Sequence, residues 1–260
     1  MSTARYVVTT LTWLWAASAR ADVPRFEFVG NRALSNRELR GAIALVFQDD
    51  SIAFDELVRR DLLTVLGAYY DRGYLEAKLA APSVDSSTNT VTVAVREGRQ
   101  FKVSAVEVTG DVLGDERAQL AKLAAHPNVA MSRTMVARDC LALAEEYEDL
   151  GYAFVDVEPM AKFDAVHATA DLQFYVRRGP LVRVESVTIV GNHVLRDEQI
   201  RKLLTFSVGD QFNLTRVLAS KRRLLAVPSV KDVVVAVERA SGPDHAVVVI
   251  EITEVPTTRI

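Results

Sequence analysis

One short pattern occurs three times in this chain, and self-similarity at a fixed period constrains a fold more strongly than any local feature. Each copy is an alternating apolar run that ends in Gly followed by Asn or Asp, as in FEFVGN, VEVTGD and VTIVGN. The glycines of the three copies, Gly30, Gly110 and Gly191, are 80 and 81 residues apart. Glycine tolerates a positive φ, and an Asn or Asp side chain can bond to the nearby backbone. Each copy therefore predicts a β-strand that ends in a turn.

A second marker has nearly the same period. Gly73-Tyr74 and Gly151-Tyr152 are 78 residues apart, and each closes a long helical pattern, where a left-handed glycine is a common helix end. A shift of 78 residues also superimposes the apolar stripes of the two helices: Val58 on Val136, Leu62 on Cys140, Val65 on Leu143 and Tyr69 on Tyr147. We assign the glycines of both markers to structural turns: Gly30, Gly73, Gly110, Gly151 and Gly191.

The third copy is more divergent than the first two. Leu214, Leu218 and Leu225 hold the helical stripe, Lys221 interrupts it, and Ser229 stands where the glycine is expected. We interpret this segment as the same unit, shortened by a few residues before its turn.

The order of elements within a unit follows from periodicity and capping signals. SNRE at residues 35–38 is a capping box that starts a short helix, and the longer helix comes next. A strand is then expected at residues 74–80, 152–158 and 231–238, and a last strand at residues 90–97, 168–177 and 246–254. Each unit is therefore predicted to be β-α-α-β-β, an α+β fold in which two helices cover one face of a three-stranded sheet.

The domain organisation combines these units with an export signal. Arg5, the apolar residues 6–19 and Ala19-Arg20-Ala21 predict a signal peptide over residues 1–21, and an uncleaved membrane anchor is the alternative. The three units are expected at residues 22–100, 101–180 and 181–254, followed by a stub at 255–260. Because the connections between units are short, we expect a semi-rigid array.

Composition and charge exclude several classes of function. A net charge of -3 gives no footprint for nucleic acid. The single cysteine, Cys140, lies on the helical stripe, which favours a small core residue over a reactive thiol.

No pattern of catalytic or ligating residues is present in the sequence. The histidines His126, His167, His193 and His245 lack metal-ligand spacing, and no nucleophile or phosphate-binding motif occurs. The acidic residues 145–149 are interpreted as a solvated helix face. We therefore predict no catalytic residue, no metal and no cofactor, with an exported enzyme as the remote alternative.

Taken together, the units resemble POTRA domains, the periplasmic modules of outer-membrane β-barrel assembly factors of the BamA and TamA type. The resemblance covers residues 22–254 and depends on the element order, the period near 80, the Gly-Asn or Gly-Asp turn, the Gly-Tyr helix end and Glu97-Gly98 at the end of the first unit. The chain departs from the family at VPSVKDV, residues 227–233, where a Gly-aromatic turn is usual. Six residues follow Glu254 where family members continue into a barrel, so we expect either a fragment of a longer gene or a free periplasmic array.

The resemblance implies a periplasmic location at the outer membrane and a non-enzymatic role in β-barrel assembly or insertion. It also implies that the strand after the second helix is an open sheet edge. Unfolded outer-membrane proteins or partner lipoproteins would add a strand there by β-augmentation. The alternatives are an adaptor that spaces or recruits envelope proteins, and the POTRA region of a polypeptide-transport barrel.

We predict that the third of these edge strands is the best binding site. The exposed face carries Glu76 and Lys78 in the first unit, and Phe154, Asp156 and Glu158 in the second, whereas the third has small apolar side chains. A proline at residue 234 is expected to block pairing if the N–H of that residue points outward. The predicted partner-binding strand consists of Lys231, Asp232, Val233, Val234, Val235, Ala236, Val237 and Glu238.

Overall fold

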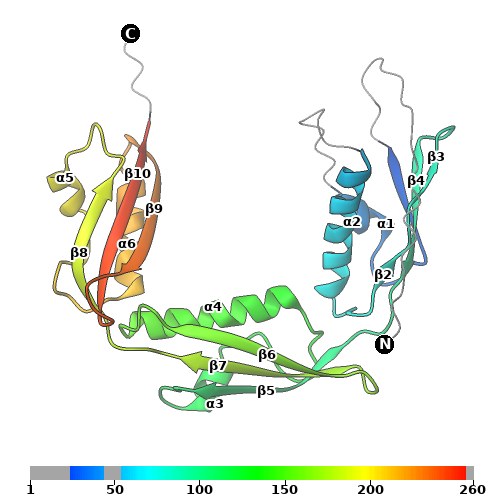
Figure 1. Cartoon of the computed structure of the whole chain (residues 1–260), viewed down its shortest axis with the longest axis horizontal. Helices are drawn as coiled ribbons and strands as arrows, with labels where there is room; N and C mark the ends of the chain where they lie inside the picture. The colour runs from blue at the N-terminus through cyan, green and yellow to red at the C-terminus, as the bar shows by residue number, and fades with distance from the viewer. Residues whose placement is uncertain (1–23, 44–53, 256–260) are drawn as a thin grey trace, which may run out of the picture. The chain divides into compact units, whose positions relative to one another are not determined.

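The computed structural model describes residues 24–43 and 54–255, so the expected signal peptide lies outside the described residues. The described residues form two compact units: those up to Leu66 together with Lys78–Glu97, and Gly67–Ala77 together with those from Gly98 to Val255. The β-α-α-β-β order occurs in the second and third repeats, and the first repeat has one additional short strand, which confirms the α+β class (Figure 1). None of the helices within the described ranges has the length and hydropathy needed to cross a membrane.

The first repeat is built around β4 (Thr90–Arg96), which pairs in parallel with β1 (Arg25–Val29). Its helices are α1 (Asn36–Gly41), which begins at the expected capping box of Ser35 and Glu38, and α2 (Phe54–Tyr70). The single strand expected at 74–80 is wrong. Two short strands, β2 (Lys78–Leu79) and β3 (Ser83–Asp85), pair antiparallel with β4, and Pro82, which has no N–H for a ladder, lies between them.

The second repeat contains β5 (Lys102–Gly110), α3 (Glu116–Leu120), α4 (Arg133–Asp149), β6 (Asp156–Asp164) and β7 (Thr169–Arg177). The central β7 pairs in parallel with β5 and antiparallel with β6. The strand expected at 152–158 begins only at Asp156, because the Val155 N–H bonds to the Tyr152 carbonyl at 3.1 Å and closes a turn.

The third repeat contains β8 (Arg183–Val190), α5 (Asp197–Arg201), α6 (Leu214–Leu225), β9 (Val230–Arg239) and β10 (His245–Glu254). Its sheet order is β8-β10-β9, with β8 parallel and β9 antiparallel to the central strand. The buried face of α6 consists of Val217, Ser220 and Leu224. Leu214 packs against the core as expected, but the rest of the expected leucine stripe is wrong, because Leu218 and Leu225 are each 40% exposed.

A buried polar residue fixes which face of the long helix points inward. In α6 the Ser220 hydroxyl accepts the Thr205 N–H at 2.8 Å. In α4 the buried Asp139 carboxylate accepts the N–H groups of Ala124 and Ala125, each at 2.8 Å. Both residues satisfy backbone amides of the segment after the short helix, which would otherwise be buried without a partner.

The repeated glycine turn has a steric cause. Gly110 has a φ of 90°, and a Cβ at this position would overlap the carbonyl oxygen of Val176 on the neighbouring β7. Gly30 and Gly191 have φ values of 91° and 81° and meet the corresponding carbonyls of Val95 and Ile252. The pattern recurs because the first strand of each repeat ends against the central strand, where only glycine fits.

Candidate functional site

The side chains that could act in catalysis or metal binding are scattered. In the part of the chain that the structure describes, no group of three or more His, Cys, Asp or Glu residues is arranged to hold a metal ion. Cys140 is partly buried against the second core. Burial, with a contribution from the adjacent Asp139, raises the pKa of its thiol, which keeps it protonated and a weak nucleophile. A functional site of this chain is therefore expected to be an exposed binding surface.

The outer side of β9 is an open sheet edge. No other strand among the described residues pairs with it, and its only sheet partner is the central β10. Val233 is fully buried, and Val235 and Val237 pack against the third core, whereas Val234 is 51% exposed and Ala236 is exposed. The alternation thus places small apolar side chains on the uncovered face of the sheet.

The ladder hydrogen bonds determine which backbone groups face outward. The Ala240 N–H donates to the His245 carbonyl at 3.0 Å, and the register is unbroken from Arg239 to Asp232. Bonded and non-bonded pairs alternate in an antiparallel ladder. Val234 and Ala236 therefore direct their N–H and C=O groups to β10, and Val233, Val235 and Val237 direct theirs outward.

One outward donor already has a partner within the strand. The Val233 N–H donates to the Asp232 carboxylate at 2.8 Å, which agrees with the outward direction deduced from the ladder. Because the N–H of Val234 points to β10, a proline there would break the sheet itself. The proline substitution considered from the sequence is thus unsuitable as a test of strand addition.

The edges that correspond to β9 in the other two sheets are less suitable. In the first, β2 and β3 contain two and three residues. In the second, β6 contains Pro159, and a proline is accommodated in an edge strand where its nitrogen faces away from the ladder. The ten-residue β9 contains no proline, and its register with β10 is continuous from Asp232 to Arg239.

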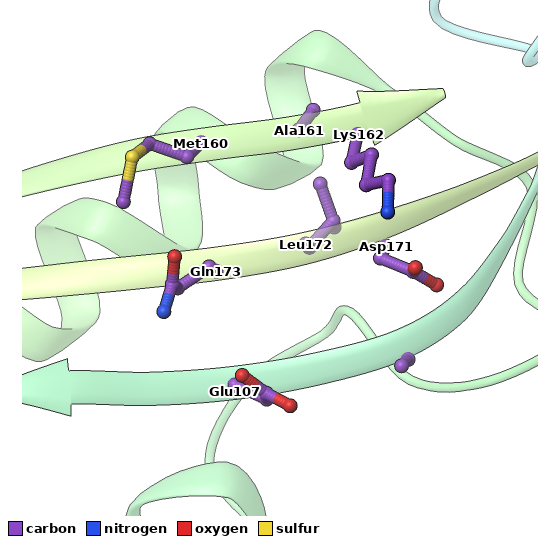
Figure 2. Close-up of a pocket in the computed structure, with 8 residues that line it drawn as sticks. Glu107, Met160, Ala161, Lys162, Asp171, Leu172 and Gln173 are labelled. Atoms are coloured by element: carbon purple, nitrogen blue, oxygen red, sulfur yellow. The ribbon is translucent and has the colours of Figure 1, made fainter. Parts of the chain in front are cut away.

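The uncovered face of the second sheet carries both charged and apolar side chains. A shallow hollow of about 320 Å³ lies over β5, β6 and β7. Figure 2 shows Glu107, Met160, Lys162, Asp171 and Gln173 standing on its three strands. Charged side chains on all three strands make this face a solvated surface, in contrast to the valine and alanine of β9.

The helix beside β9 presents two half-exposed leucines, Leu218 and Leu225, with Lys221 between them on the same flank. α6 packs mainly over β9, and the carbonyl of its residue Arg216 accepts the hydroxyl of Thr205, which follows α5. At 3.6 residues per turn, Leu218 and Leu225 lie on the opposite flank of the helix. This flank is remote from α5, and its half-exposed leucines stand on the side of the free edge.

The junction between the second and third repeats is held by backbone and side-chain hydrogen bonds. The Val182 N–H donates to the Gly151 carbonyl at 2.9 Å, and the Gln211 amide donates to the Leu150 carbonyl at 2.7 Å. Asp149 accepts from the Thr215 N–H and hydroxyl. The interpretation of residues 145–149 as a merely solvated face is therefore wrong for Asp149.

Phe154 also belongs to this junction. It packs against the third core, and the Arg239 guanidinium lies 4.2 Å from its ring centroid. The expectation that Phe154 occupies the exposed face of an edge strand is thus wrong, because the strand starts two residues later.

Gly67–Ala77, the end of α2 and the turn after it, make the same kind of junction with the second repeat. The Phe101 N–H donates to the Gly73 carbonyl at 2.7 Å. Asp71 accepts from the Thr134 N–H and hydroxyl at 3.2 and 2.9 Å. The signal for both junctions was present in the sequence, because Asp71 and Asp149 each stand two residues before the Gly-Tyr pair.

Small α+β repeats in tandem, each with an open sheet edge, define a class of modular repeat proteins. The model of the POTRA family, described as a surface antigen variable number repeat, matches residues 22–98, 101–179 and 182–255. The chain belongs to the POTRA family.

Similar proteins include outer-membrane assembly factors. BamA of Nitratidesulfovibrio vulgaris, an outer membrane protein assembly factor, is 26% identical over 78% of this chain, and BamA of Neisseria meningitidis is 24% identical over 78%. The chain spans 27% of the length of each of these relatives. The crystal structure of POTRA domains 3–5 of Haemophilus influenzae BamA has a TM-score of 0.73, with 22% identity, 90% of this chain and 96% of that chain covered, which establishes the shared fold.

Proposed function

We propose that this chain is the periplasmic POTRA part of an outer-membrane protein assembly factor, exported by a signal peptide at residues 1–21. In this proposal the edge of β9 binds extended segments of unfolded outer-membrane proteins, and partner lipoproteins are a second class of partner. The relatedness to assembly factors named BamA supports the general role. Binding uses backbone pairing and requires no cofactor.

The observation that carries the proposal is the set of outward backbone groups on β9. Val235 and Val237 present N–H and C=O groups two residues apart, the repeat with which an added strand pairs. Backbone pairing makes little demand on sequence, which suits a binder of many different unfolded chains. The added strand would place alternate side chains beside Val234 and Ala236, and the others beside Leu218 and Leu225.

An NMR titration tests this proposal. Barrel-strand peptides are added to the isotope-labelled chain, and amide shifts are expected along β9 and the adjoining flank of α6. Val234→Lys places a charge beside the added strand and should weaken binding, whereas Thr188→Lys places the same charge on the exposed face of β8, at the far edge. Shifts confined to other elements, or equal effects of the two substitutions in folded chains, would refute the proposal.

The bonded junctions favour a second candidate function, that of a spacer. In this alternative the array holds envelope proteins at fixed separation and its sheet edges bind nothing. The same titration separates the two functions, because a spacer gives no shifts on β9 with any peptide.

A further inference from the structure

The apolar part of the β9 edge is surrounded by carboxylates on the exposed face of the sheet. Asp232 and Glu238 flank Val234 and Ala236 on β9 itself, and Glu251 pairs with Val234 from β10. All three acids are exposed. Across residues 24–43 and 54–255, no basic side chain forms an ion pair with any of them, as the ion pairs of the structure lie elsewhere.

The basic residue that follows Glu238 at the end of the strand makes another contact. Arg239 holds its guanidinium over the Phe154 ring in the junction, and its register partner is Ala246 on the buried face of β10. Lys231, the other basic residue of β9, is exposed, and within the described residues neither basic residue of the strand forms an ion pair with the three acids.

The edge of the second sheet differs in this respect. Its acids Asp156 and Glu158 both bond to Arg177 on the central β7, Glu158 at 3.1 Å. The carboxylates of β6 are thus compensated inside their own sheet, whereas Asp232 and Glu238 of β9 form no ion pair among the described residues.

A strand added to β9 continues the pleat, so its side chains alternate between the two faces of the sheet. One set faces the α6 flank with Leu218 and Leu225. The other set lies on the exposed face, where directly opposite residues have Cβ atoms about 4.5–5.5 Å apart and diagonal neighbours about 7–8 Å apart. Long basic side chains on this face reach Asp232 and Glu238, whereas acidic side chains there meet like charge.

The carboxylate of Asp232 links the charge of an incoming strand to its backbone pairing with β9. Its carboxylate accepts the outward Val233 N–H, so it occupies a donor that an added strand would use. A basic side chain of the incoming strand offers this carboxylate a competing partner and releases the Val233 N–H. An acidic strand offers no such exchange.

We propose that β9 selects extended segments with apolar residues on one face and lysine or arginine on the other, and discriminates against segments whose polar residues are acidic. This inference depends on the proposed strand addition at β9, since the backbone edge supplies binding and the carboxylates supply selectivity. Exposed ion pairs contribute little individually, so two or three of them give about a 3–10-fold preference at low ionic strength. Salt should reduce that preference because the charges are exposed.

The test uses three peptides that share one apolar face and carry Lys, Gln or Glu at every polar position. Their affinities for the whole chain are measured by fluorescence anisotropy at low and high salt. The expected order is Lys, then Gln, then Glu, and the double variant Asp232→Asn/Glu238→Gln should bring the three affinities together. Glu107→Gln, which removes an exposed acid from the second sheet, should leave the order unchanged and controls for overall charge.

The outcomes separate the two proposals. Equal affinities of the three peptides, or an equal loss of preference in Glu107→Gln, would overturn the charge selectivity while strand addition stands. Failure of all three peptides to bind would overturn strand addition and the selectivity with it.

Discussion

Asp149, the last residue of α4, accepts hydrogen bonds from both the backbone N–H and the hydroxyl of Thr215, the second residue of α6, at 2.7 and 2.8 Å. The long helix of the second repeat thus ends on the first turn of the long helix of the third, where free N–H groups attract a carboxylate. Asp71 and Thr134 form the same pair one repeat earlier.

The first prediction concerns this carboxylate. Asp149→Ala removes the acceptor of the Thr215 N–H, so we expect a loss of about 0.5–1 kcal/mol in the stability of the third repeat, as for an exposed helix cap. Amide hydrogen exchange at Thr215 should accelerate, and denaturant unfolding gives the free energy. Glu145→Ala, an exposed acid on the same helix, is the matched control. An unchanged Thr215 exchange rate would mean that Asp149 does not hold the junction.

A larger effect is expected for the buried carboxylate of Asp139. Asp139→Ala leaves the N–H groups of Ala124 and Ala125 without their acceptor, and unsatisfied buried groups cost about 1–3 kcal/mol each. We expect the second repeat to lose about 2–4 kcal/mol in urea unfolding. Asp139→Asn retains one acceptor and should cost less. Equal losses for the two variants would show that the hydrogen bonds are not the cause.

Alanine substitution at two glycines is expected to change stability in opposite directions. Gly151 has a φ of 104°, and a Cβ there would overlap the side chain of Gln211, so Gly151→Ala should destabilise the chain by about 1–3 kcal/mol. Gly67 lies inside α2 with nothing within 4 Å of an added Cβ, so Gly67→Ala should stabilise by about 0.4–1 kcal/mol. Thermal melts of both variants give the signs, and a shared sign would contradict this explanation.

The third repeat should also lose stability in acid through Glu254. Hydrogen bonds from the backbone N–H groups of Leu195, Val194 and His193 lower the pKa of this carboxyl from its ordinary value of 4.5. Because the pKa is lower in the folded chain, the stabilisation is complete above about pH 4.5 and disappears as the pH falls through the folded pKa. Glu254→Gln should flatten this part of the pH dependence of stability. A variant whose stability falls with acid as steeply as the parent would contradict the assignment.

The sequence was sufficient for the repeat, for the element order of the second and third units and for the strand at 231–238, because alternation and turn glycines are local signals. It failed where apolar residues serve the junction instead of the sheet. The sequence pattern places Phe154 in a strand, although this residue packs against the next repeat. The pattern also predicts that Leu218 and Leu225 are buried. They are exposed, because Ser220 lies on the buried face of the helix.

The direction of the outward N–H groups could not be predicted from the sequence. It depends on which pairs of the β9 and β10 ladder are hydrogen-bonded, and side-chain alternation does not reveal this. Whether Asp232 and Glu238 form ion pairs likewise depends on where the basic side chains lie in space. The expected edge was thus located from sequence, whereas its donors and its charge environment required the structure.

The central claim is that an extended segment pairs with the outward backbone groups of β9, and residue-resolved amide hydrogen exchange tests it most directly. In the chain alone, the amides of Val234 and Ala236 should exchange slowly because they bond to β10, whereas those of Val235 and Val237 should exchange quickly. Addition of a saturating barrel-strand peptide should slow Val235 and Val237 and leave Val234 and Ala236 nearly unchanged. Protection that spares Val235 and Val237 while the peptide is bound would contradict strand addition at β9.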